Sequence, residues 1–426
     1  MNLSTSHTRR CAASPRLLVA FLTAAVALCL LALTSSPPSA RATVTRAGIE
    51  SPVCSWAGET DQRDVNIGAP DDDERDWLSP LTPSSSNEVV ISGEYPSARY
   101  FSFHVYNDEG EALGSIYDQE IAPDPGSANP YVAKPRKGTA RSYHVTIRFE
   151  PTPADPAPNT FYAGEPSASP VALLVYRVYV PTDSESPTGG VPYPRVTVAT
   201  SEGTPLVEDA SCSITPPSFG SEVWQTFAEG SLPDGLINYT PSDATNPPQW
   251  SRAFGSRLGN QQNAYLTTDI SSSYGELAVF HAKAPTFPNT VAGVPVYDNR
   301  QLRYWSFCTY DPEGEALVGC EPDYESAIRG GQYTFVVSNA ADRPANATAA
   351  NGVTWLPLGA QPAAQIVFRN MLPAANFPYA AEDITSSTQN VQQTMRPYYP
   401  QTVYCSKATF EAGGWNACKK AVAKEG

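Results

Sequence analysis

Fifteen residues of this chain recur 204 positions later without a gap. Residues 99–113 read RYFSFHVYNDEGEAL, residues 303–317 read RYWSFCTYDPEGEAL, and ten of the fifteen positions are identical. An internal repeat of this kind indicates two copies of one structural unit. We therefore expect the chain to build the same domain twice.

The repeat continues beyond this block with a smaller offset. The stretches that begin at Tyr143 and Tyr333, and later at Leu174 and Ile366, match in position and pattern with an offset of 190 to 192. Copy one therefore carries 14 additional residues, which lie after Asp118 within Gln119–Gly138. Insertions at surface loops cost little stability, so the segment is either a plain loop or a functional one.

Within each copy the pattern predicts β-strands. Along residues 99–106, Phe101, Phe103 and Val105 alternate with more polar neighbours, which is the period of a strand. Further strands are predicted at 145–149, 173–180, 333–337 and 366–372. The 41 prolines and 28 glycines exclude long helices. The sequence predicts an all-β protein of two tandem antiparallel β-sandwich, jelly-roll-like domains with few short helices.

The N-terminus has the pattern of a signal peptide. Arg9, Arg10 and Arg16 precede an apolar run at 17–33, and a small-residue cleavage site ends at Ala42. We expect residues 1–42 to be removed and the protein to be secreted, with an uncleaved anchor as the alternative. No later stretch reaches about 18 apolar residues, so we expect no other membrane span.

The rest of the chain is acidic. Removing residues 1–42 takes away four arginines and no acidic residue, so the net charge falls from −15 to −19. This charge argues against nucleic acid and anionic membrane surfaces as partners.

The composition divides the mature chain into four parts. We predict copy one with its entry segment at 43–200 and a connector rich in Pro, Ser and Gly at 201–262, with a short helix around 222–228. Copy two follows at 263–385. A disulfide-closed tail without a counterpart in copy one occupies 386–426.

Six cysteines remain after signal removal, and six allow 15 pairings. The copy-one equivalents of Cys308 and Cys320 are His104 and Ile116, so both cysteines are missing together and we expect them to bond. Cys405 and Cys418 lie close together in the tail, which leaves Cys54 with Cys212. No C-x-x-C pair is present, so disulfides in an exported protein are favoured over zinc.

The common catalytic motifs are missing from the sequence, and we expect no cofactor and no metal. Ser102 and His104 are the most tempting catalytic pair, but residues two apart on a strand point the same way and we expect them not to converge. The acidic turns at 107–111 and 311–315 lack the length and alternation of a calcium loop and are interpreted as solvated hairpins. Arg99 and Arg303, which recur at matching positions, predict a repeated structural ion pair.

Several strings are specific enough to indicate a family. They are LRYWSFC at 302–308, NATAANGVTWLP at 346–357, FRNMLP at 368–373 and the closing YYP…YC…GW…C of the tail. They resemble a family of exported, uncharacterised proteins of high-GC Gram-positive bacteria, and each copy is similar to β-sandwich domains of unknown function. The resemblance implies the architecture and export but no catalytic residue.

These observations favour a secreted, non-catalytic protein that binds a glycan or another cell-wall component. A binding site should use features that differ between the copies, so we expect ligand contacts at Tyr100, His104, Tyr106, Asp118, Glu120 and Asp124. The alternative is an extracellular, carbohydrate-active hydrolase with a carboxylate site on copy one. An enzyme should show acids in a deep pocket, and a binder a shallow aromatic groove at the domain interface. The oligomeric state stays open.

Overall fold

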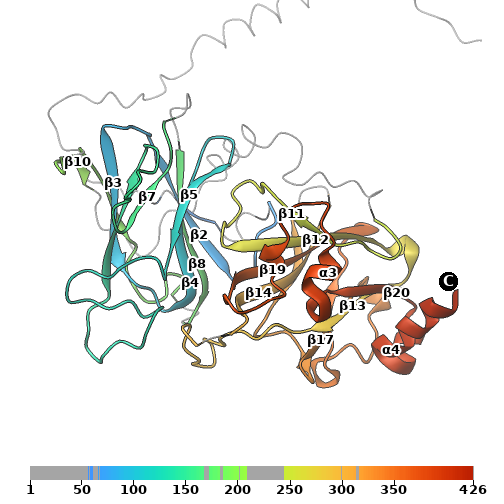
Figure 1. Cartoon of the computed structure of the whole chain (residues 1–426). Helices are drawn as coiled ribbons and strands as arrows, with labels where there is room; N and C mark the ends of the chain where they lie inside the picture. The colour runs from blue at the N-terminus through green and yellow to red at the C-terminus, as the bar shows by residue number, and fades with distance from the viewer. Residues whose placement is uncertain are drawn as a thin grey trace, which may run out of the picture. The chain divides into compact units, whose positions relative to one another are not determined.

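The computed structural model describes residues 56, 58–60, 66, 68–166, 172–182, 186–200, 202–208, 244–298, 300–312 and 316–425. The predicted signal peptide, the predicted short helix at 222–228 and the predicted Cys54–Cys212 pair lie outside these residues. Figure 1 shows the strands of the described part and the helices near the C-terminus.

Copy one forms two five-stranded sheets. The first has the order β1 (Gly58–Thr60), β2 (Glu74–Leu81), β8 (Ala172–Pro181), β4 (Ala98–Tyr106) and β5 (Ala112–Tyr117). The second has the order β10 (Pro205–Glu208), β9 (Arg195–Thr200), β3 (Asn87–Glu94), β6 (Ser142–Arg148) and β7 (Thr160–Tyr162). All neighbours are antiparallel except β6 and β7.

Copy two repeats this arrangement. Its first sheet has the order β11 (Ser251–Ala253), β12 (Asn263–Ser271), β19 (Ala363–Pro373), β14 (Leu302–Tyr310) and β15 (Leu317–Pro322). Its second has the order β16 (Ile328–Arg329), β17 (Gln332–Ser338), β13 (Leu277–Lys283) and β20 (Gln401–Cys405), with β18 (Thr354–Pro357) parallel to β17. The helices are α3 (Val391–Met395) and α4 (Lys407–Glu425), and the 3-10 helices are η2 (Ser272–Tyr274), η3 (Ala340–Asp342), η4 (Ala349–Asn351), η5 (Ala381–Asp383) and η6 (Arg396–Tyr398).

The equivalent strands of the two copies lie in the same order, and the chain has the predicted all-β fold. The two sheets of each copy pack on an aromatic core, with Phe101, Phe103 and Tyr143 in copy one and Trp305, Phe307 and Tyr333 in copy two. The inner strands β4 and β14 are buried at every residue, on both faces. One face of each strand packs on the core of its own copy, so another part of the chain must cover the opposite face.

The hairpins that carry the cysteines differ by one residue, and this corrects one equivalence. Cys308 lies opposite Cys320, whereas His104 lies opposite Ser115. The copy-one equivalent of Cys320 is therefore Ser115, and Ile116 was wrong because copy two carries one more residue in this hairpin. The expected Cys308–Cys320 bond is present.

The tail is partly a repeat element, contrary to our expectation. Strand β20 pairs with the central strand β13 in the place where β9 pairs with β3 in copy one. The following helix α4 is tied to this strand by the predicted Cys405–Cys418 disulfide, whose Cα atoms are 5.4 Å apart. Two bonded cysteine pairs are compatible with an oxidising compartment.

Long insertions distinguish the copies, and one from each copy bears on the site described below. Between β5 and β6 copy one has residues 118–141, where copy two has only 323–331 before β17. Between β13 and β14 copy two has residues 284–301, where copy one has only 95–97. The first insertion was predicted and the second was not. In the part of the chain that the structure describes, no helix has the length and apolar character needed to cross a membrane.

Candidate functional site

The two copies are joined by reciprocal ion pairs. Arg99 pairs with Asp323 of copy two, and both side chains are fully buried. Arg303, the equivalent of Arg99, places its Nη1 3.0 Å from Oδ1 and 3.2 Å from Oδ2 of Asp118 in copy one. The repeated arginines are thus structural, as the sequence predicted, and each one binds the carboxylate of the other copy.

Burial dominates the protonation of these carboxyl groups. It raises the pKa of Asp323 to about 6, against the opposing effect of Arg99. Burial likewise raises the pKa of Asp118, against Arg303 and the N–H of Phe101. A buried carboxylate without its arginine would therefore be strongly unfavourable.

Two equivalent backbone segments cover the outer faces of β4 and β14, and each belongs to the opposite copy. We name residues 68–73 arm one and residues 257–262 arm two. Arg369 of copy two donates to the carbonyl of Ala69 in arm one, and Arg177 of copy one donates to the carbonyl of Leu258 in arm two. Ala69 and Leu258 share the left-handed conformation, with φ of 55° and 51°.

Tyrosine hydroxyls also donate hydrogen bonds from the strands of one copy to the arm of the other copy. Tyr310 donates to the carbonyl of Pro70 at 2.8 Å, and Tyr106 donates to the carbonyl of Gly259 at 2.9 Å. The arms therefore satisfy polar groups that would otherwise be buried without partners. They also explain why β4 and β14 are buried on both faces.

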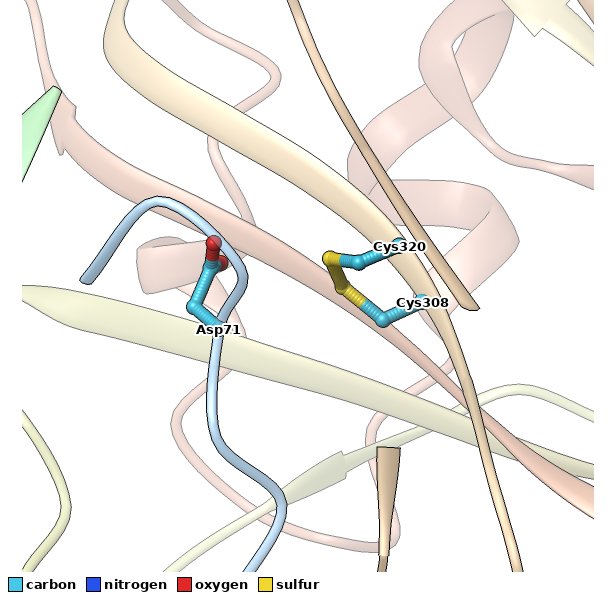
Figure 2. Close-up of side chains that lie close together, drawn as sticks. All are labelled: Asp71, Cys308 and Cys320. Atoms are coloured by element: carbon cyan, nitrogen blue, oxygen red, sulfur yellow. A yellow bond between two sulfur atoms is a disulfide. The ribbon is translucent and has the colours of Figure 1, made fainter. Parts of the chain in front are cut away.

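Asp71 of arm one lies beside the Cys308–Cys320 disulfide, as Figure 2 shows. Its carboxylate accepts hydrogen bonds from Tyr304 at 2.7 Å and Ser306 at 2.6 Å. One ligand atom from each of Asp71, Cys308 and Cys320 falls within 4.8 Å of the others. The two sulfurs are bonded to each other and so offer no thiolate ligand. We interpret this cluster as part of the arm contact.

The aromatic residues predicted as ligand contacts lie inside the protein. Tyr100 and Tyr106 are fully buried, so they form no exposed aromatic wall on their strand. His104 is also buried, and burial, followed by the charge of Arg177, holds its pKa well below the usual range. The Nε2 of His104 lies 2.9 Å from Oγ of Ser102, so these side chains do converge, contrary to our expectation.

The three predicted acidic residues have different surroundings. Asp118 is sealed in its ion pair with Arg303. Glu120 is exposed, and its carboxylate accepts a weak hydrogen bond from the N–H of Tyr117 at 3.4 Å. Asp124 pairs with His144 at 2.7 Å on the outer face of copy one. The structure thus does not gather the six predicted residues into one site, and their role in binding stays a prediction.

A groove of about 470 Å³ lies at the contact between the copies, and we name it the interface groove. Copy one contributes Tyr117 and Gln119, and the remaining lining comes from copy two, in residues 288–303 and 372–376. The polar and aromatic lining of copy two consists of Tyr297, Asp298, Arg300, Arg303 and Asn376.

Both insertions border this groove. Gln119 belongs to the insertion of copy one, and Tyr297 and Arg300 belong to that of copy two. Val296, next to Tyr297, packs against the core of copy one. One long insertion from each copy therefore reaches the same groove.

The second insertion also makes the two sides of the interface unequal. The ring of Phe287 lies 5.4 Å from the guanidinium of Arg99, and Oγ1 of Thr290 accepts a hydrogen bond from Nε of Arg99 at 3.2 Å. These two residues cover Arg99. Its equivalent Arg303 lines the open groove instead. The two equivalent arginines thus have different surroundings, one sealed and one beside a groove.

The groove offers donors and aromatic surface. Arg300 pairs with Asp298 at 2.5 Å while both stay about two-fifths exposed, which balances their charges without closing the groove. Tyr117 and Tyr297 are half-buried, and Asn376 and Gln119 are exposed amides. This combination suits hydroxyl-rich, uncharged ligands with apolar ring faces.

No protein-family model and no curated protein matches the chain. An uncharacterised protein of Burkholderia cenocepacia of known structure is similar at 14% identity with a TM-score of 0.49, over 83% of this chain and 82% of its own. A Vibrio parahaemolyticus protein is similar at 10% identity with a TM-score of 0.39, over 79% of this chain and 90% of its own. Neither similarity carries information on function.

Proposed function

We propose that this chain is an exported, non-catalytic protein that binds a glycan of the cell envelope in the interface groove. The observation that carries the proposal is the meeting of both insertions at one groove, since a purely structural repeat needs neither. The signal-like N-terminus, the disulfides and the acidic surface support export. The resemblance that we infer from strings such as LRYWSFC at 302–308 points the same way.

The groove lining supports a saccharide as the ligand. Tyr117 and Tyr297 provide ring surface for the apolar face of a sugar, and Arg300, Asn376 and Gln119 provide donors for its hydroxyls. Arg300 and Arg303 are each paired with a carboxylate, so the groove holds little unbalanced charge. We therefore expect a neutral polysaccharide rather than a polyanion.

The test is a binding screen of the mature, oxidised protein (residues 43–426) against purified wall polysaccharides and whole cell walls. Tyr297→Ala should weaken binding about tenfold, which corresponds to about 1.4 kcal/mol. Tyr274→Ala, at a tyrosine outside the groove that is 43% exposed, is the matched control and should bind like the wild type.

Equal binding by Tyr297→Ala and the wild type would remove the interface groove from consideration. Release of reducing sugar ends by the wild type, lost in Glu120→Gln or Asp124→Asn, would instead support the hydrolase alternative, because those carboxyl groups on copy one remain open to solvent.

A further inference from the structure

A second polar groove lies on the outer face of copy one, on the sheet that contains β3, β6 and β9. It has a volume of about 430 Å³, and its lining includes Ser92, Glu94, Ser142, His144, Tyr193 and Arg195. We name it the outer-face groove. None of these residues lines the interface groove.

One side of the outer-face groove is held by the insertion of copy one. Nδ1 of His144 lies 2.7 Å from Oδ1 of Asp124, while the His144 side chain remains 60% exposed. The N–H of Asp124 donates to the carbonyl of Ser142 at 3.0 Å, which fixes the insertion to the strand. The imidazole is therefore oriented by its carboxylate partner yet open to a ligand.

The sheet register extends this pair into a row. Ser92 lies opposite His144 on one side and opposite Arg195 on the other. Directly opposed residues project from the same face of a sheet, and neighbouring strands are about 4.8 Å apart. The row thus presents a guanidinium, a hydroxyl and an imidazole side by side on one face of the sheet.

Beneath the row lies a buried hydroxyl without a partner. Tyr143 lines the groove and is fully buried, and within the described residues its hydroxyl has no hydrogen-bond partner. A Cβ on the opposing Gly93 would come within 2.8 Å of this hydroxyl, so the glycine leaves it room. The Tyr143 ring belongs to the core of copy one, so it lies on the opposite face of the sheet from His144 and supports the floor of the groove.

The same face is used differently in copy two. There the outward residues Leu277, Val279 and Val336 form an apolar cluster with Phe410 of helix α4. Trp415 of the same helix stacks on His281, with ring centroids 5.0 Å apart. Copy two thus closes this face with its disulfide-tied helix, whereas in copy one the face is polar and His144 remains exposed.

We propose that the outer-face groove is a second carbohydrate-binding site, so that one chain contacts a neutral polysaccharide at two places. The ligand class rests on the proposed function. Arg195 donates, Glu94 accepts, and Ser92 and His144 do either, which matches hydroxyl groups that both donate and accept. Pro192 and Tyr193 supply apolar surface for a sugar ring.

The test uses the mature chain and a soluble polysaccharide that the wild type binds. Two sites on one chain should give a stoichiometry of two by calorimetry with short oligosaccharides, and cross-linking of long chains seen as light scattering. His144→Ala with Arg195→Ala should reduce the stoichiometry to one and abolish scattering, while the remaining affinity changes less than twofold. Arg148→Ala, on the same strand but outside the groove, should leave both readings unchanged.

The outcomes separate the two proposals. A wild-type stoichiometry of one, or two sites retained in His144→Ala/Arg195→Ala with an unchanged circular dichroism spectrum, would overturn the second site and leave the first. Tyr297→Ala with Arg300→Ala should remove only the other site. If the wild type binds none of the polysaccharides, the proposed function is refuted and the second site with it.

Discussion

Replacing Arg303 by methionine tests the reciprocal ion pairs that join the copies. The methionine would keep most of the length of the side chain but leave the Asp118 carboxylate, which is fully buried, without its cation. Asp118 would keep the hydrogen bond from the N–H of Phe101 at 3.1 Å. Arg303→Met therefore creates an uncompensated buried charge rather than a cavity.

The expected size follows from this geometry. Breaking a buried ion pair from one side typically costs about 3–5 kcal/mol, whereas replacing both partners by apolar residues is often close to neutral. We expect Arg303→Met to lower the free energy of unfolding at pH 7 by about 3 kcal/mol or more. Arg303→Met combined with Asp118→Leu should recover more than half of that loss.

The assay is guanidinium unfolding of the oxidised protein, followed by fluorescence and circular dichroism. A double-mutant cycle over Arg303 and Asp118 measures their coupling. Because Asp118 in the single variant is neutral when protonated, the cost of Arg303→Met should shrink between pH 7 and pH 4. Arg300→Met, at a neighbouring exposed arginine, is the control and should change stability by less than about 0.5 kcal/mol.

A loss below about 1 kcal/mol in Arg303→Met, or a double variant no more stable than the sum of the single effects, would refute the reasoning. Either result would mean that Asp118 reaches water and that the copies are not joined through this pair.

Three further predictions concern stability and assembly. Burial, with the charge of Asp71, raises the pKa of Asp73 from 3.8 to about 7, so the folded state holds a proton that the unfolded state loses, and stability should fall as pH rises from about 4 to 7. Asp73→Asn should flatten this slope in pH-dependent thermal melts, and an unchanged slope would contradict the assignment to Asp73. Replacing Cys405 and Cys418 by alanine removes a disulfide with a sequence separation of 13 and should lower the free energy of unfolding by about 3 kcal/mol. The variant should also expose Trp415 to fluorescence quenchers, whereas unchanged quenching would show that helix α4 docks without the bond. Cleavage at a protease site placed within residues 213–243 should leave one particle of unchanged mass in light scattering, because the arms and ion pairs join the copies. Separation into halves would contradict this exchange.

The fold was predictable because the repeat preserves what its strands need. The alternating aromatic residues around Phe101 and Trp305, and the turn that follows them, recur in both copies. The same assignment of a strand and a turn therefore had to fit both sequences. The Cys308–Cys320 bond followed from a paired absence, even though the assumed equivalent Ile116 was one residue away from Ser115. A single-residue difference in a hairpin is invisible when the flanking string aligns without a gap.

The interface groove was not predictable in the same way. The insertion at 284–301 begins before the matching block, where the copies share too few residues to show the change of offset, and only strand register located it. The pair between Asp124 and His144 joins a loop to a strand 20 residues away, which no local pattern encodes. The alternation along the strand of Tyr100 and Tyr106 does not say whether its second face is exposed, and the exchanged arms bury that face.

Hydrogen exchange with and without a wall polysaccharide tests most directly whether the interface groove binds a glycan. On the mature protein we predict slower amide exchange in residues 286–303 and 117–121 when the polysaccharide is present, with the core strand β4 unchanged. Protection confined to other surfaces, or no protection at saturating polysaccharide, would contradict the account.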